Sequence, residues 1–134
     1  MEKVTITVEA EIHPTEDEEK VKTAVNNVLS NADITIKSNG KSSALYAKAQ
    51  GKESLNKFRN MLRNDRIRDA ARKMLFKSTH GNTIFFFLNK QVVFANHVSF
   101  CERSGESPQG PLKVTIETEN PQQLVEWLAE KTVK

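Results

Sequence analysis

The sequence predicts an α+β fold, a mostly antiparallel sheet with helices packed on one face, in the order β-α-β-β-α-α-β-β-β-α. Two observations favour this class. Residues 4–12 alternate apolar and polar side chains, which is typical of a strand with one buried face. The expected strands also group in pairs and triplets between helices, as in α+β proteins.

A helix is expected directly after the first strand. Thr15 and Glu18 have the spacing of a capping box, in which the two side chains satisfy free backbone N–H groups at a helix start. Apolar residues within 21–29 then follow helical spacing, so this helix has one buried stripe.

The middle of the chain predicts a hairpin followed by two helices. Two short apolar segments, residues 34–36 and 44–50, flank the turn signal Asn39-Gly40. Residues 54–62 and 67–75 then repeat apolar side chains at helical spacing, and a break between them falls at residues 64–65.

Three strands and a last helix complete the expected order. The apolar run within 82–88 is typical of a strand buried on both faces, and 92–100 predicts another strand. Residues 112–117 alternate cleanly. Asn120 followed by Pro121 is a favoured way to enter a helix, because proline at the first helical position lacks an N–H that would be unpaired anyway.

Size and composition indicate one globular domain spanning residues 1–134. Hydrophobic residues make up 37% of the chain and charged residues 28%, so a packed core is expected. No apolar stretch approaches the ~20 residues that span a bilayer, so we expect no membrane association. A single cysteine, Cys101, excludes an internal disulfide, and a reducing cytoplasm is the expected location.

The sequence offers little support for an enzyme. The five glycines are scattered rather than gathered in a phosphate loop. His13, His80 and His97 lie in separate segments without metal-ligand spacing, so we expect no catalytic residue, metal, cofactor or small-molecule substrate. An enzymatic function would require a cleft that joins His97 to Lys90 and Glu106.

A basic segment is the better functional candidate. Residues 57–77 contain eight Lys or Arg against two Asp, a local charge of +6 in a chain whose net charge is only +3. On the predicted third helix, Arg66, Lys73 and Lys77 share one face, which would bind phosphates in a salt-dependent way. The candidate RNA-binding residues are Arg59, Arg63, Arg66, Arg72, Lys73, Lys77 and Lys90.

Two alternatives stay open at this point. Asp65 and Asp69 are three or four residues from basic side chains, so part of the charge is expected to be paired internally. Phe85, Phe86 and Phe87 alternate faces of a strand, so at least one of them is expected to point away from the core; core packing competes with base stacking as their role.

Several segments together resemble an archaeal family, uncharacterised protein family 0201 (UPF0201), whose members are described as predicted RNA-binding proteins. The matching words are VEAEIHPTEDEEKV (8–21), LRNDRIRDAARKML (62–75), GNTIFFFLNKQVVF (81–94), ESPQGPLKV (106–114) and NPQQLVEWLAEKT (120–132). The resemblance implies a fold similar to that of the large-subunit ribosomal protein that contacts 5S ribosomal RNA. It also implies a homodimer, and it supplies no catalytic residue.

The resemblance further marks polar motif positions whose role is unknown. Besides basic residues already named, these are Asp65, Asn82, Asn89, Gln91, Ser107 and Pro108. Two hypotheses follow. The first is a non-enzymatic module that binds structured RNA weakly through its basic helical face. The alternative is a dimeric interaction or scaffold protein with an RNA-binding-like fold that binds no nucleic acid.

Overall fold

A computed structural model of the protein describes residues 3–40, 42–101 and 111–130. The described residues form one seven-stranded antiparallel sheet in the order β2-β3-β1-β7-β5-β4, and β6 also pairs with β5. The strands are β1 (Val4–Ile12), β2 (Asp33–Asn39), β3 (Ser42–Gln50), β4 (Thr79–His80), β5 (Thr83–Leu88), β6 (Phe100–Cys101) and β7 (Leu112–Thr118). The helices are α1 (Glu18–Val28), the 3-10 turn η1 (Lys52–Leu55), α2 (Asn56–Asn64), α3 (Arg68–Lys77), α4 (Lys90–Phe94) and α5 (Pro121–Leu128).

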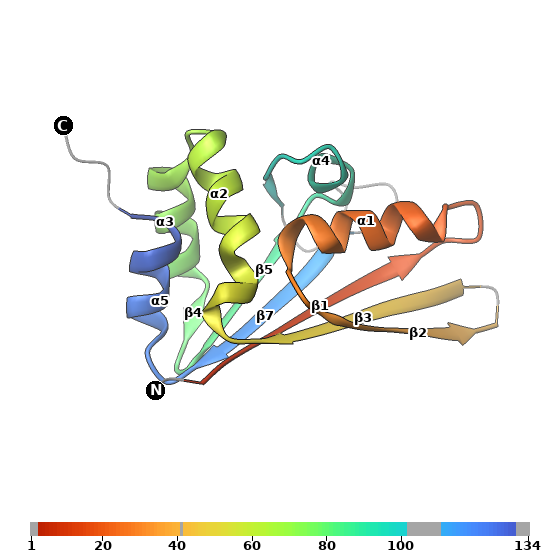
Figure 1. Ribbon diagram of the computed structural model, residues 1–134, viewed down its shortest axis with the longest axis horizontal. Coiled ribbons are helices and arrows are strands. Elements are labelled where there is room, and N and C mark those ends of the chain that lie inside the picture. The colour runs from red at the N-terminus through yellow and green to blue at the C-terminus, as the bar shows by residue number, and fades with distance from the viewer. Residues whose placement is uncertain (1–2, 41, 102–110, 131–134) are drawn as a thin grey trace.

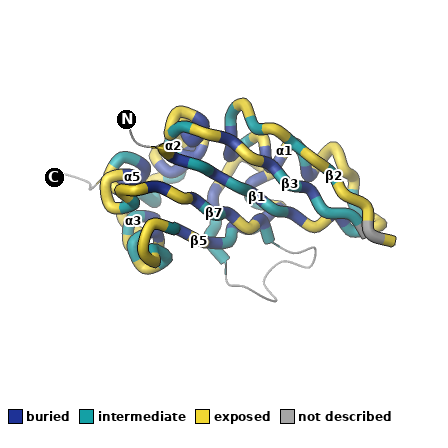
Figure 2. The backbone as a smooth tube through the Cα atoms, turned by 90° about the horizontal axis from the view of Figure 1, so that it is seen from below, coloured by how far each residue is buried: buried dark blue, intermediate teal, exposed yellow. Residues whose placement is uncertain are grey.

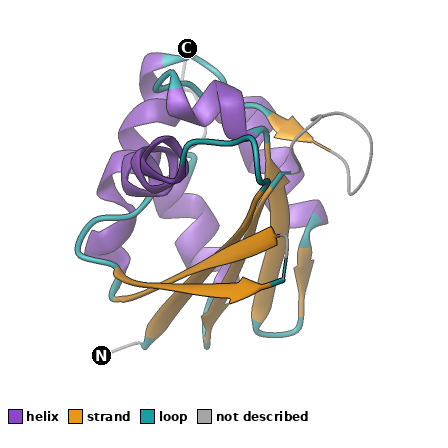
Figure 3. Ribbon diagram, turned by 90° about the vertical axis from the view of Figure 1, so that its right-hand side faces the viewer, coloured by secondary structure: helices purple, strands orange, loops and turns teal. Residues whose placement is uncertain are grey.

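All the helices pack on one face of the sheet, as Figure 1 shows, and the side view in Figure 3 separates the helical layer from the strands. The alternation in β1 explains this arrangement. Ile6 lies opposite Ala49 of β3 and Ile116 of β7, and all three are buried beneath the helices. The predicted fold class is therefore confirmed.

Helix α2 is anchored to the sheet by an aromatic stack. Phe58 is fully buried, and its ring lies 5.8 Å from that of Phe86 on β5, centroid to centroid, at an interplanar angle of 15°. Phe86 also contacts Phe100 of β6, with ring centroids 5.6 Å apart. Such aromatic pairs contribute roughly 0.5–1.5 kcal/mol beyond the burial of their area. The stack holds the helix α2, which carries part of the basic segment, against the strand β5.

The opposite face of the sheet carries no helix among the described residues, and Figure 2 views the molecule from that side. Phe85 is 43% exposed there, and its ring meets the ring of Phe87 edge to face at 5.0 Å. Glu9 and Lys113 form an ion pair on the same face, with 3.3 Å between carboxylate and ammonium. As predicted, the three consecutive phenylalanines divide between the two faces, but the expectation that this strand is buried on both faces is wrong, because its residues on the open face are exposed or only half-buried.

Two local expectations are wrong. Residues 92–100 were expected to form one strand, but α4 occupies the start of this segment and only the two-residue strand β6 remains at its end. Asn89 caps α4, because its side-chain oxygen accepts a hydrogen bond from Val92 N at 3.1 Å. Likewise, Asp17 rather than Thr15 caps α1 and accepts from Glu19 N at 2.9 Å. The longer elements and β6 keep the expected order.

Candidate nucleic-acid interface

The basic segment folds into a helical hairpin made by α2 and α3. Arg66 does not belong to α3, contrary to expectation, because the helix begins at Arg68. It lies at the corner between the two helices with a φ of 57°, in the left-handed region. Lys73 and Lys77 do share one side of α3, since they are four residues apart.

Two of the candidate arginines hold helices together instead of facing solvent alone. Arg59 of α2 donates from Nε to the Trp127 carbonyl at 2.8 Å, forms an ion pair with Glu130, and lies 5.1 Å from the centre of the Trp127 ring. Arg72 of α3 donates two hydrogen bonds to the Glu126 carboxylate at 2.8 and 2.6 Å. These bonds raise the pKa of Arg72 above its ordinary value.

Lys90 is buried, so the structure removes it from the exposed basic face. Its side chain is 4% exposed, and Nζ donates to the Glu11 carbonyl at 2.7 Å and to both oxygens of Glu16 at 3.1 and 3.0 Å. Glu16 is 7% exposed and also accepts from His13 N at 3.1 Å. This buried ion pair ties α4 to the segment before α1.

The remaining candidates form an exposed basic group. Arg63 lies in the last turn of α2, followed by Arg66 at the corner and by Lys73 and Lys77 on α3. Within the part of the chain that the structure describes, none of these four side chains takes part in an ion pair. We call these four residues the basic hairpin.

Asp65 does not pair with the basic side chains three or four residues away, as its position in the chain indicates. Its carboxylate accepts from the His97 ring nitrogen Nδ1 at 2.8 Å and from Val98 N at 2.8 Å, so it joins the α2–α3 corner to the segment after α4. Burial raises the pKa of Asp65, but these hydrogen bonds and the nearby His97 outweigh burial and hold the pKa below its ordinary value. The expected pairing of Asp65 with its neighbouring arginines is therefore wrong.

Of the other motif positions, Asn82 and Asn89 make hydrogen bonds that hold the backbone. Asn82 lies in the β4–β5 turn, and its carbonyl accepts from Thr118 N at 2.9 Å. Asn89 caps α4, and Gln91 is exposed on the same helix. Ser107 and Pro108 lie outside the described residues, as does Glu106 of the catalytic cleft considered above. His97 and Lys90, the other two members of that cleft, pair with different carboxylates.

A cavity between α1 and α4 was not foreseen from the sequence. It has a volume of about 310 Å³ and is lined by Thr15, Glu16, Asp17, Lys20, Val21, Lys90, Gln91 and Phe94. Phe94 is 41% exposed, and Lys20 Nζ lies 5.8 Å from the centre of its ring. Expecting a strand at 92–100 hid this site, because Lys90, Gln91 and Phe94 line the cavity from the helix α4.

Comparison with known proteins gives consistent results. A protein-family model described as RNA binding matches residues 5–118. A UPF0201 protein of Sulfurisphaera tokodaii is 44% identical over 129 residues, which are 96% of this chain and 89% of the relative.

Two solved structures share the fold. The crystal structure of a UPF0201 protein from Methanococcus jannaschii matches with a TM-score of 0.84 at 28% identity, over 96% of this chain and 95% of that one. A second UPF0201 crystal structure matches with a TM-score of 0.82 at 32% identity, over 96% and 94% of the two chains. Among the described residues, no helix is long and apolar enough to cross a membrane.

Proposed function

Because this chain belongs to the archaeal UPF0201 family, we propose that it is a non-catalytic protein that binds RNA through the basic hairpin. The single observation that carries the proposal is the exposure of Arg63, Arg66, Lys73 and Lys77 without ion-pair partners among the described residues. Cations already paired to carboxylates gain little from a phosphate, whereas solvated cations release counterions from the nucleic acid when they bind it. The match to a family model described as RNA binding supports the same function.

The geometry of the hairpin suits a short run of phosphates. From Arg68 to Lys77 the helix α3 rises about 13 Å, at about 1.5 Å per residue. Lys73 and Lys77 follow this rise on one side, and the Asp65–His97 hydrogen bond of 2.8 Å fixes the corner that carries Arg66. The positive charge is therefore held on a packed scaffold.

The test is titration of the protein with a pool of total archaeal RNA at several salt concentrations. Four phosphate contacts on single strands give a slope of log affinity against log salt of about −3, which is about 50-fold weaker binding at 200 mM than at 50 mM salt. The double variant Lys73→Glu/Lys77→Glu should bind much more weakly and with a shallower slope.

The matched control is Lys37→Glu/Lys48→Glu, which changes the net charge equally but on the two strands β2 and β3. This variant should keep most of the affinity. Equal losses in both variants would reject the basic hairpin as the contact surface. No binding by the unaltered protein at low salt, about 50 mM, would reject RNA binding itself.

A second proposal, homodimerisation, draws on the open face of the sheet. Its support is the exposed Phe85, packed against Phe87, on a surface of mixed charge that includes the Glu9–Lys113 pair. A surface of this kind is better matched by a second copy of itself than by a polyanion. Sedimentation equilibrium tests this: the unaltered chain should be dimeric and Phe85→Glu monomeric, and a monomeric unaltered chain would refute the proposal.

A further inference from the structure

From the geometry of the cavity between α1 and α4, we infer that it binds a single nucleobase and prefers bases that carry an exocyclic amino group. The inference rests on the proposed function, because it gives RNA a second contact, one that reads a base instead of a phosphate. The basic hairpin supplies charge, but a row of phosphate contacts carries no sequence information.

The floor of the cavity is rigid and electrically balanced. Lys90 and Glu16 are both more than nine-tenths buried and neutralise each other through two hydrogen bonds of 3.1 and 3.0 Å. Lys90 is further fixed by the Glu11 carbonyl at 2.7 Å. A phosphate at this floor would lie against the Glu16 carboxylate, so a neutral, planar and polar group fits better than an anion.

The rim offers a stacking surface and a cation. Phe94 exposes 41% of its surface beside the cavity, although an aromatic side chain is normally buried. Every base has a π face, so an exposed phenylalanine ring stacks on bases generally. Lys20 Nζ lies over this ring, 5.8 Å from its centre. A base that stacks on the same face displaces the ammonium, which then meets the phosphate of the stacked nucleotide.

The polar lining sets the expected preference among bases. Glu16, Asp17 and Thr15 bring hydrogen-bond acceptors to the wall next to the Gln91 amide. Exocyclic amino groups of adenine, cytosine and guanine offer two N–H donors on one nitrogen to such acceptors, whereas uracil offers only its ring N3–H and places oxo groups beside it. A cavity of about 310 Å³ is at the small end of ligand sites, which range from about 300 to 1,000 Å³, so it admits one nucleoside and excludes a duplex.

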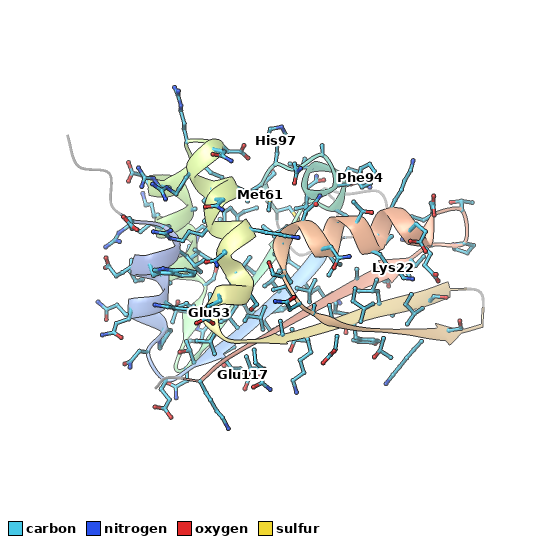
Figure 4. The ribbon with its side chains drawn as sticks, viewed as in Figure 1. Lys22, Glu53, Met61, Phe94, His97 and Glu117 are labelled. Atoms are coloured by element: carbon cyan, nitrogen blue, oxygen red, sulfur yellow. The ribbon has the colours of Figure 1, made fainter. Side chains whose placement is uncertain are left out.

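The cavity and the basic hairpin belong to the same helical layer. Figure 4 shows His97 and Phe94 on the helical side of the molecule and Glu117 on the opposite side of the sheet. His97 is bonded to Asp65 at the corner of the basic hairpin, and Phe94 ends the helix that precedes it. A single strand of RNA that contacts the corner can therefore reach the cavity without crossing the sheet.

The first experiment uses adenosine monophosphate and inosine monophosphate, which differ at position 6, where inosine has an oxo group instead of the amino group. Both are titrated into isotope-labelled protein while backbone amide signals are followed by NMR. Adenosine monophosphate should shift the amides of Lys20, Gln91 and Phe94 with a dissociation constant on the order of 1 mM. Inosine monophosphate should bind at least about 5-fold more weakly, because its 6-oxo oxygen faces the acceptors to which the amino group donates. Equal affinity for the two nucleotides would overturn the base preference.

The variant Phe94→Leu keeps an apolar side chain at the rim but removes the ring. It should weaken adenosine monophosphate binding by about 5-fold or more, because the base loses the aromatic ring on which it stacks. Phe85→Leu, an equally exposed ring on the open face, is the matched control and should bind normally. Absence of shifts at those three amides, equal affinity of Phe94→Leu, or equal loss in both variants would overturn the inference.

The RNA titration separates this inference from the proposed function. If RNA binds with the expected salt dependence but adenosine monophosphate leaves the cavity unaffected, the cavity inference fails alone. If adenosine monophosphate binds in the cavity but RNA does not bind at about 50 mM salt, the proposed function fails, and a free nucleotide is the ligand. Weaker binding of RNA by Phe94→Leu with an unchanged salt slope would identify RNA as the source of the base.

Discussion

Replacing Lys90 with methionine should destabilise the protein far more than replacing an exposed lysine in the same kind of pair. The Lys90 and Glu16 side chains are 4% and 7% exposed, so Lys90→Met leaves a carboxylate buried without its cation. Breaking a buried pair in this way costs about 3–5 kcal/mol. At roughly 4 °C per kcal/mol for a chain of this length, the melting temperature should fall by about 12–20 °C.

The matched control is Lys113→Met, which breaks the Glu9–Lys113 pair. Those two side chains are 39% and 47% exposed, so the expected loss is about 0–1 kcal/mol because solvent already screens the interaction. Urea denaturation followed by circular dichroism gives the free energy of unfolding of both variants and of the unaltered protein. Similar losses for Lys90→Met and Lys113→Met would refute the argument from burial.

A double variant tests whether the unpaired charge is the cause. Lys90→Met/Glu16→Gln removes both charges, and the glutamine oxygen is still able to accept the hydrogen bond from His13 N. We therefore expect the double variant to be more stable than Lys90→Met alone. If the second change adds its own loss instead, packing of the lysine stem, not charge burial, explains the effect.

Two further predictions concern the corner and the cap. Asp65→Asn should lower the unfolding free energy by about 1 kcal/mol at pH 7, because it weakens the hydrogen bonds from His97 and Val98. The folded-state pKa of Asp65 lies below its ordinary value of 3.8, so this stabilisation is present above pH 3.8 and is lost as the pH falls through the folded-state pKa. Urea denaturation should therefore show a smaller difference in unfolding free energy between the unaltered protein and Asp65→Asn at pH 3 than at pH 7. A constant difference would contradict this prediction. Asn89→Ala should cost about 1 kcal/mol by removing the cap of α4, and hydrogen exchange should speed up at Val92 and Val93 but not in α5.

The sequence was sufficient to predict a helix or strand wherever its pattern of apolar residues was long and regular. The alternation of β1 and the apolar stripes of α1 and α3 each repeat over several turns or pairs of residues, so burial of one face dictates the element. It was misleading at α4, where the apolar residues Val92 to Phe94 favour a strand. These residues instead form the helix α4, which docks against α1. Asn27 Nδ2 of α1 donates a hydrogen bond to the Val93 carbonyl at 2.9 Å.

The candidate site was harder to predict because its pairing is non-local. The Arg72–Glu126 and Lys90–Glu16 pairs join residues 54 and 74 positions apart, and no local pattern indicates either partner. The charge of the basic segment was visible in the sequence. The helix α5, which packs against α2 and α3, decides which of the basic side chains stay exposed. Asp65 likewise bonds to His97, 32 residues away, instead of to a neighbouring arginine.

The central position of β1 also determines when the protein can fold during synthesis. This strand is synthesised before its neighbour β7 (Leu112–Thr118), and every other described strand of the sheet lies between the two in the sequence. Until β7 has been synthesised, one edge of β1 stays open and β5 has no neighbour that joins it to the sheet. From the synthesis of β1 until that of β7, a nascent chain therefore exposes unpaired backbone groups and apolar side chains of β1, a hazard for aggregation that a fold built from sequential neighbours avoids.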